Sequence, residues 1–281
     1  MERPDDYESL TTLVISCKNL TELPCWVSKC KKLKELYCGH NNITQLDNLP
    51  QTLTKLYCSE NKIIHLNNLP KTLEYLNCSD NKIKRLDNLP QTLKNLKCYN
   101  NQITQLDNLP QTLEILQCYN NQITQLNNLP YELKELYCSH NKITQLDNLQ
   151  ITLQKISCAF NQITQLDNLP PTLEILNCEH NQITQLDNLP QTLKQLYCHF
   201  NYITHLDNLP QMLELLHCFN NKITQLDNLP PILIDLYCSS NQLTQLDNLP
   251  MTLTKLYCYD NPLKYAFEAR LENIRNYNSQ K

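Results

Sequence analysis

Cysteine recurs every 20 residues along most of this chain without a single slip. An Asn follows three residues after each of these cysteines, and a Pro closes ten of the units in the same register, with Gln150 as the one substitution. The cysteine column comprises Cys38, Cys58, Cys78, Cys98, Cys118, Cys138, Cys158, Cys178, Cys198, Cys218, Cys238 and Cys258. A fixed short period predicts stacked copies of one structural unit, each burying its apolar face against its neighbours.

The unit reads L-x-x-L-x-C-x-x-N-x-I-T-x-L-D-N-L-P-x-x. In the stretch K-L-Y-C-S, Leu56 and Cys58 alternate with polar or amphipathic neighbours, which is the period-two pattern of a half-buried strand. The remaining limb, I-T-Q-L-D-N-L-P-Q-T-L, is too short and too restricted by Pro for a full helix, so we expect extended or turn-rich backbone there. One longer connector, W-V-S-K-C-K-K-L, has room for a helical turn.

These motifs resemble the leucine-rich repeat family, most closely its short 20-residue bacterial-type subclass whose units end in Leu-Pro. The resemblance covers roughly residues 10 to 263. It implies an α/β-type repeat solenoid: an arc with one parallel β-sheet on the concave face, an extended or turn-rich convex side and few helices. The abundance of Asn, Ile, Lys and Tyr is similar to that of proteins encoded by AT-rich genomes, such as those of giant viruses or bacterial pathogens.

We expect three segments. Residues 1–32 form an N-terminal cap with a divergent first repeat and a longer connector, and residues 33–262 form twelve 20-residue repeats. Residues 263–281 form a C-terminal amphipathic helical cap, because Leu263, Phe267, Leu271 and Ile274 recur at helical spacing. Solenoids need such caps to keep their end units soluble.

Composition narrows the functional classes. The net charge of −4 does not favour a nucleic-acid partner, and no apolar run is long enough to cross a membrane. The N-terminal residues MERPDDYESL lack the apolar stretch of a secretory signal. We therefore expect a cytoplasmic protein, in the host cytoplasm if it is viral or an effector, and a monomer.

The repeated Cys and Asn are predicted to be structural. The alternation turns the Cys column inward as small apolar side chains, and each Asn is expected to adopt a left-handed conformation and bond nearby main-chain groups. Zinc binding and disulfides are the alternatives for Cys, and both are disfavoured by a straight file of thiols at the strand spacing. Cys17, Cys25 and Cys30 lie outside the column and are expected to be the more reactive ones. The ladder in the middle of the chain comprises Cys118, Asn121, Cys138, Asn141, Cys158 and Asn161.

A third column holds Asp in most units, at positions such as Asp47, Asp107 and Asp147. An Asp before Asn-Leu-Pro is an ordinary turn cap. The alternative is a stacked carboxylate site for calcium, as in some β-helix repeats.

Specificity is expected where the units differ, on the outward face of the strands and just beyond them. An aromatic and His-rich patch is predicted there as a protein-binding surface, because exposed aromatic clusters are typical of binding hot spots. Its members are Tyr137, Phe160, His180, Tyr197, His199, Phe200, Leu215, His217, Phe219 and Tyr237. The alternatives are that Phe160 and Phe200 tuck under the following loop, and that His180, His199 and His217 join Glu179 in a zinc site.

The sequence thus predicts a non-enzymatic scaffold that binds a protein through its concave face, with no catalytic residues, no cofactor and no metal. The first alternative is an architectural or assembly component, for example of a virion, without a specific client. The weaker alternative is a small-molecule or metal-binding enzyme site in the His and aromatic patch.

Overall fold

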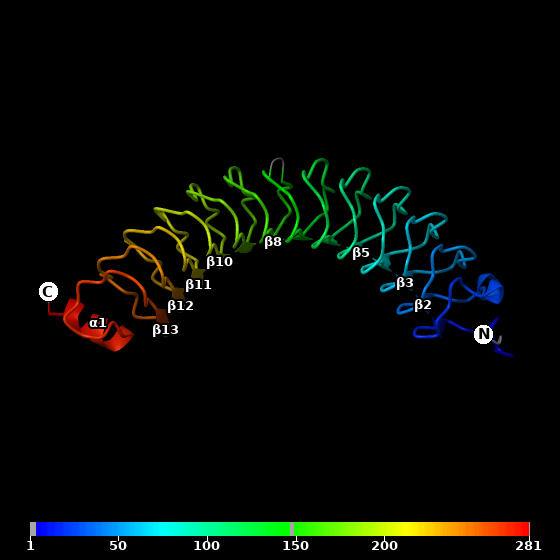
Figure 1. Cartoon of the computed structure of the whole chain (residues 1–281), viewed down its shortest axis with the longest axis horizontal. Helices are drawn as coiled ribbons and strands as arrows, with labels where there is room; N and C mark the ends of the chain where they lie inside the picture. The colour runs from blue at the N-terminus through cyan, green and yellow to red at the C-terminus, as the bar shows by residue number, and fades with distance from the viewer. Residues whose placement is uncertain (1–3, 147–148, 281) are drawn as a thin grey trace. The chain divides into compact units, whose positions relative to one another are not determined.

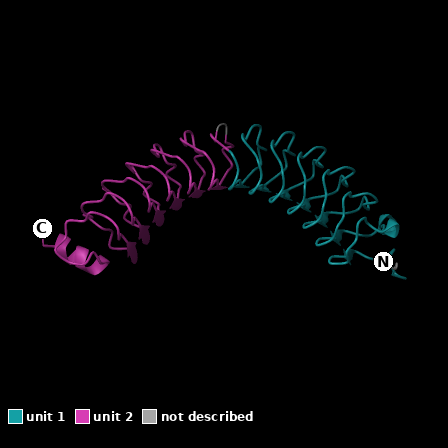
Figure 2. Ribbon diagram, in the orientation of Figure 1, with its two compact units in different colours: residues 1–142 teal, residues 143–281 magenta. Residues whose placement is uncertain are grey.

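The structure, a computed structural model, describes residues 4–146 and 149–280. It divides into two compact units, residues 1–142 and residues 143–281 (Figure 2). In each unit the strands are parallel and line the inner edge of that unit's curve, while the return limbs form the outer side (Figure 2). Each unit is therefore a solenoid built around a parallel sheet, as the repeat predicts.

Within the described part of unit 1, seven strands follow one another in chain order. They are β1 (Thr12–Val14), β2 (Glu35–Tyr37), β3 (Lys55–Tyr57), β4 (Tyr75–Asn77), β5 (Asn95–Lys97), β6 (Ile115–Gln117) and β7 (Glu135–Tyr137). A 3₁₀ helix, η1 (Cys25–Lys29), occupies the connector that the sequence left open for a helical turn.

Within the described part of unit 2, six strands are arranged in the same way, and one helix follows them (Figure 1). The strands are β8 (Lys155–Ser157), β9 (Ile175–Asn177), β10 (Gln195–Tyr197), β11 (Leu215–His217), β12 (Asp235–Tyr237) and β13 (Lys255–Tyr257). The helix is α1 (Leu271–Asn278).

Within β2–β7 and within β8–β13, neighbouring strands pair residues that are 20 positions apart, as Leu96 and Leu116 are, whereas β1 pairs with β2 at a separation of 23 residues. The central residue of each strand points inward, and so does the residue two positions later, which is Ile15 after β1 and a Cys after the other strands. Leu116 and Cys118 are fully buried, as are Leu113 and Ile123 of the same repeat. Because one repeat presents only a three-residue strand, the apolar core exists only where repeats stack.

The Asn ladder supplies main-chain hydrogen bonds between repeats. Asn121 Nδ2 donates to the carbonyls of Cys98 (3.0 Å) and Cys118 (3.1 Å), and Asn121 Oδ1 accepts from the Ile103 N–H at 2.9 Å. The same pattern recurs at Asn141, and Asn161 Oδ1 accepts from the Ile143 N–H.

The expected left-handed conformation belongs to other residues. The ladder Asn does not have positive φ, whereas the residue immediately before it does, from His40 (φ 52°) to Asp260 (φ 53°). A second left-handed column follows the Asp column, at Asn48, Asn68 and their equivalents. The predicted left-handed conformation of the ladder Asn was therefore wrong. The amide of the ladder Asn points into the stack of repeats, and the residue before it adopts the left-handed conformation that turns the chain. The lone glycine, Gly39, does not have positive φ.

The C-terminal cap is shorter in helix than expected. The helix α1 begins at Leu271, so Leu263 and Phe267 lie outside it. The segment before it still follows the repeat: the Lys264 N–H donates to the Thr244 carbonyl at 2.9 Å, and Leu246 N–H donates to the Tyr265 hydroxyl at 2.7 Å. These bonds hold residues 263–265 in return-limb geometry, which delays the helix.

Helix α1 packs on the last repeat. Ile274 is fully buried, and Arg275 Nη2 donates to the carbonyls of Pro250 (2.6 Å), Met251 (3.1 Å) and Leu253 (3.0 Å). The helix therefore covers apolar surface and also satisfies carbonyls that a further repeat would otherwise have engaged.

Candidate functional site

A continuous set of aromatic rings lies along the strands and strand ends of unit 2. We call it the aromatic surface of unit 2, and it comprises Phe160, His180, Tyr197, His199, Phe200, His217, Phe219, Tyr237 and Tyr257. Tyr197, His217, Tyr237 and Tyr257 are the last residues of β10, β11, β12 and β13, and each alternates with a Leu that points inward. The strand pleat therefore places their rings on the outward face.

Three rings occupy the left-handed turn positions. Phe160, His180 and Phe200 have φ of 52°, 49° and 53°. Their rings stack face to face, with centroids 4.0 Å apart for Phe160 and His180 and 4.1 Å apart for His180 and Phe200. Left-handed backbone costs an ordinary residue roughly 1–2 kcal/mol and is tolerated best by Gly, Asn and Asp.

A second layer of rings supports this stack. His199 stacks on Phe219 with centroids 4.2 Å apart, and Phe200 meets Phe219 edge to face at 5.4 Å. Along the strands, Tyr197 contacts His217, which contacts Tyr237, which stacks on Tyr257 at 4.4 Å. The rings support one another because each is about one strand spacing from the next.

The buried ring of His199 has one hydrogen-bond partner. Its Nε2 contacts the carboxylate of Glu179, and its Nδ1 is buried without a partner. Burial, followed by the nearby His217 and His180, lowers the pKa of His199 to about 4. The imidazole is therefore neutral at pH 7, and Nε2–H donates to Glu179.

Other charged groups border the strand residues. Asp235 Oδ2 accepts a hydrogen bond from Lys255 Nζ at 3.0 Å, while Asp235 Oδ1 is buried without a partner. Burial lowers the pKa of His217, an effect that Asp235 opposes. The surface is thus aromatic, with the neutral His199 near its centre and carboxylates at its border.

The structure places nine of the ten sequence-predicted residues together in unit 2. Leu215, the first residue of β11, lies half-buried between Gln195 and Asp235 in the sheet register. Tyr137 belongs to unit 1, where its hydroxyl donates to Glu135 at 2.7 Å. Phe160 and Phe200 remain 39% and 40% exposed, whereas Phe219 is half-buried and His199 buried.

Sequence reasoning missed two features of this surface. Tyr257 extends the row of rings, which the Tyr series on the outward strand positions already signalled. The carboxylate of Glu179 lies against His199, and no sequence signal distinguishes this pairing from a zinc site. Among the described residues, no group of three or more His, Cys, Asp or Glu is placed to hold a metal ion.

The Cys column is buried and its thiols are protonated. Burial raises the pKa of Cys118 to about 12 and that of Cys98 well above its ordinary value. Of the three cysteines outside the column, Cys17 and Cys25 are exposed. The expectation of reactivity was wrong for Cys30, which is buried against Trp26 and Val27 with a pKa raised by burial.

The described members of the Asp column, such as Asp47 and Asp107, are exposed at turns, except for the half-buried Asp247. Asp147 lies outside the described residues. Each described Asp of the column precedes an exposed Asn in the left-handed conformation, so the interpretation as a turn cap accounts for their placement.

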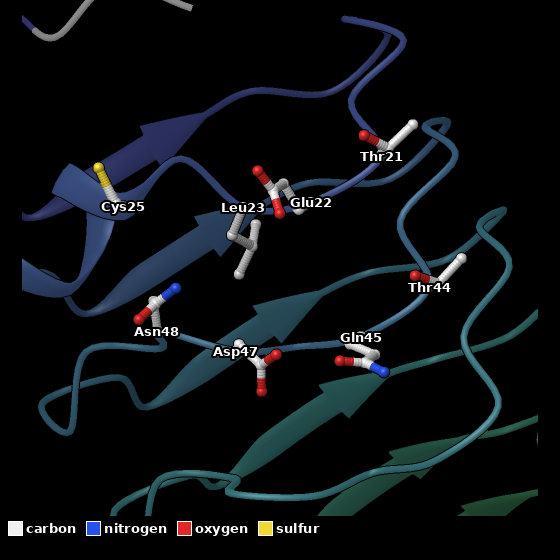
Figure 3. Close-up of a pocket in the computed structure, with 8 residues that line it drawn as sticks. All are labelled: Thr21, Glu22, Leu23, Cys25, Thr44, Gln45, Asp47 and Asn48. Atoms are coloured by element: carbon white, nitrogen blue, oxygen red, sulfur yellow. The ribbon is translucent and has the colours of Figure 1, made fainter.

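A polar pocket of about 550 Å³ lies on unit 1 beside η1 (Figure 3). Figure 3 shows that two neighbouring return limbs contribute most of the lining, with Glu22 on one and Gln45 and Asp47 on the other, while Cys25 comes from the start of η1. The described lining residues include no His or Lys that would activate the Cys25 thiol. Glu22, Cys25 and Asp47 are all exposed, so the pocket has no desolvated reactive group.

Within residues 4–146 and 149–280, no helix is both long and apolar enough to span a bilayer.

Family models for leucine-rich repeats match residues 8–51 and 72–96. No curated protein sequence matches the chain. Among solved structures, the chain is similar to YopM from Yersinia enterocolitica WA-314, with 30% identity and a TM-score of 0.70 over 87% of this chain and 62% of that one. It is also similar to the functional domain of InlJ from Listeria monocytogenes, described as including a cysteine ladder, with 30% identity and a TM-score of 0.75 over 92% of this chain and 65% of that one.

The internalin InlF from Listeria monocytogenes shares the fold, with 23% identity and a TM-score of 0.83 over 93% of this chain and 84% of that one. The chain spans less than two thirds of the length of the YopM and InlJ chains.

Proposed function

The chain is a leucine-rich repeat protein of the bacterial type, and from this premise we propose that it is a non-enzymatic scaffold that binds a protein partner through the aromatic surface of unit 2. Proteins with this repeat are generally scaffolds for protein–protein interaction rather than enzymes. Stacked repeats suit that role because they present a long surface whose outward residues vary freely over a constant core.

The observation that carries the proposal is the choice of residue at three left-handed turns. Asn100, Asn120 and Asn220 occupy this position in other repeats, and Asn tolerates the conformation well. Phe160, His180 and Phe200 occupy it in unit 2 and leave two Phe rings about 40% exposed. The chain therefore loses both backbone stability and apolar burial at these turns, and backbone strain of this kind clusters at ligand-contacting positions.

Rigid aromatic side chains also suit a binding surface energetically. The stacked rings hold one another in place, so little side-chain entropy remains to be lost when a partner binds. Aromatic residues dominate the binding energy of protein interfaces for this reason and because of their large contact area.

The test is a pull-down from a eukaryotic cytosolic lysate with matched variants. The binding variant carries Phe160→Asn, His180→Asn and Phe200→Asn, which installs the residue that other repeats use at the same turn. The control carries Met212→Asn and Met251→Asn, which removes exposed apolar side chains from the turns before β11 and β13. Circular dichroism establishes that all three proteins fold.

We expect a partner to be retained by the native protein and the control and lost by the triple Asn variant. Retention by the triple variant would show that the partner binds elsewhere. If the native protein captures nothing above the level of the triple variant, the binding proposal fails and the architectural alternative gains.

We further propose that the protein works in a reducing compartment such as the cytoplasm. Cys17 and Cys25 are exposed free thiols, which an oxidising compartment would convert to disulfides or oxidised forms. Mass spectrometry after thiol blocking in intact cells tests this: fully blocked cysteines support the proposal, and disulfide-linked peptides would refute it.

A further inference from the structure

Glu179 carries a negative charge on the aromatic surface that its only described partner does not neutralise. Its carboxylate contacts His199 Nε2, and its side chain is 21% exposed. No Lys or Arg within the described residues lies at ion-pair distance from it. By contrast, Glu174, the residue before β9, pairs with Lys194 at 2.8 Å, and Asp235, the first residue of β12, pairs with Lys255. These neighbouring carboxylates have lysine partners, whereas Glu179 has none among the described residues.

His199 is held in a form that cannot neutralise Glu179. A protonated imidazole needs an acceptor for each N–H, and Nδ1 of His199 is buried with no partner. Protonation of Nδ1 would therefore bury an N–H that has no acceptor. Burial also solvates the imidazolium charge poorly, and this lowers the pKa of His199. The contact with His199 fixes the position of the half-buried Glu179 carboxylate.

Aromatic rings surround His199, the partner of this carboxylate. The Phe160 N–H donates to the main-chain carbonyl of Glu179 at 3.0 Å, and His199 contacts the rings of Phe219, Phe200 and His180. Ring faces attract cations through their quadrupole, and a carboxylate beside them adds a hydrogen-bond acceptor. The combination favours a planar cation, because an arginine guanidinium both stacks on aromatic rings and donates two N–H groups to one carboxylate.

We propose that Glu179, together with the rings of His180 and Phe200 that contact its partner His199, forms a binding site for an arginine side chain, and hence that the protein partner presents a basic segment. This inference rests on the proposed function and specifies the chemistry of the partner. An acidic or purely apolar partner would leave the Glu179 carboxylate on this surface without a counter-charge, which would weaken its binding. Glu179 therefore favours partners that carry a positive charge.

The test uses defined peptides rather than a lysate. Fluorescence anisotropy measures binding of a labelled nine-residue peptide of alternating Gly and Arg, with the same peptide carrying Lys or Asp in place of Arg. The protein is compared with Glu179→Gln and with Glu214→Gln. Glu214→Gln makes the same change in net charge at the residue before β11, at the opposite end of the strand from Phe219. Gln at 179 still accepts the His199 Nε2–H, and thermal melts show whether each variant keeps its fold.

We expect the Arg peptide to bind more tightly than the Lys peptide and the Asp peptide not to bind. Glu179→Gln should weaken Arg-peptide binding roughly tenfold or more, as loss of a charge-assisted hydrogen bond does, and Glu214→Gln should change it less than about twofold. Equal weakening by both variants would reduce the effect to net charge and overturn the proposal. Equal binding of the Arg and Asp peptides, or no binding of the Arg peptide at millimolar concentration, would overturn it as well.

The outcome is separable from that of the proposed function. If the peptides fail while the triple Asn variant still loses a lysate partner, the surface binds proteins but does not select arginine. If the triple Asn variant also retains that partner, the surface itself was wrongly assigned.

Discussion

Replacing Asn121 with Ala should remove more stability than any exposed substitution in the repeats. The Asn121 amide donates to the carbonyls of Cys98, Cys118 and Tyr119, and its oxygen is the acceptor for the Ile103 N–H. The three carbonyls keep a second donor each, from Asn101, Asn141 and the Asn100 N–H respectively. Ile103 is fully buried, and its N–H would lose its partner.

The magnitude follows from this count. An orphaned buried N–H costs roughly 1–3 kcal/mol, and the two N–H groups of the amide contribute about 1 kcal/mol each, which gives a loss of roughly 3–5 kcal/mol. Asn121→Asp keeps the acceptor for Ile103 but turns an oxygen toward three carbonyls, so it should destabilise at least as much. Gln122→Ala, at the exposed next residue, should change stability by less than about 0.5 kcal/mol.

Urea unfolding followed by circular dichroism measures the differences. Because long repeat arrays do not always unfold in one step, amide hydrogen exchange across residues 98–141 supplies the local free energy. If Asn121→Ala and Gln122→Ala differ by less than about 0.5 kcal/mol in both measurements, the Asn ladder does not hold the repeats together and the reasoning fails.

Four further predictions concern other parts of the molecule. A thiol reagent should label Cys17 and Cys25 rapidly in the native protein and the other cysteines only after unfolding; rapid labelling of the Cys column would contradict its burial. The folded pKa of His199, about 4, lies below its unfolded value near 6.5, so the unfolded state takes up the proton first. The free energy of unfolding should therefore fall by up to about 3 kcal/mol as the pH drops from about 6.5 to about 4. His199→Gln should flatten the plot of urea midpoint against pH over this range, and an unchanged plot would contradict the assignment of the effect to His199. Arg275→Ala should lower the hydrogen-exchange protection of residues 246–258 by about 2 kcal/mol, because the guanidinium donates hydrogen bonds to three carbonyls. Arg275→Lys should restore this protection only in part. Equal protection in the native protein and both variants would show that Arg275 does not stabilise the last repeat. A chelator should leave the thermal melt unchanged, and a large fall in melting temperature would revive calcium at the Asp column.

The repeat register and the buried face were predictable from the sequence. A Cys in phase with Leu every 20 residues allows only one orientation of each strand, because a shift by one residue would expose every apolar side chain. The strand pairing of Leu96 with Leu116 and the burial of Cys118 follow from that alone.

The conformation of the turns and the electrostatics of the aromatic surface were not predictable. No local rule assigns a left-handed backbone to Phe160 or Phe200, since propensity favours Asn there. The contact between Glu179 and His199 joins adjacent repeats, and its protonation state depends on burial that only the packed structure defines. The late start of α1 likewise depends on Tyr265, whose hydroxyl bonds to the preceding repeat.

Site-specific photo-crosslinking at Phe200 tests the binding function most directly. Benzoylphenylalanine at position 200 places the reactive group within the aromatic surface of unit 2, and the same residue at the exposed Met212 serves as the matched control. After irradiation in cytosolic lysate, we expect a discrete protein adduct from position 200 that is absent from position 212 and is competed away by excess unmodified protein. Adducts of equal yield at both positions, or none from position 200, would contradict the assignment of this surface as the binding site.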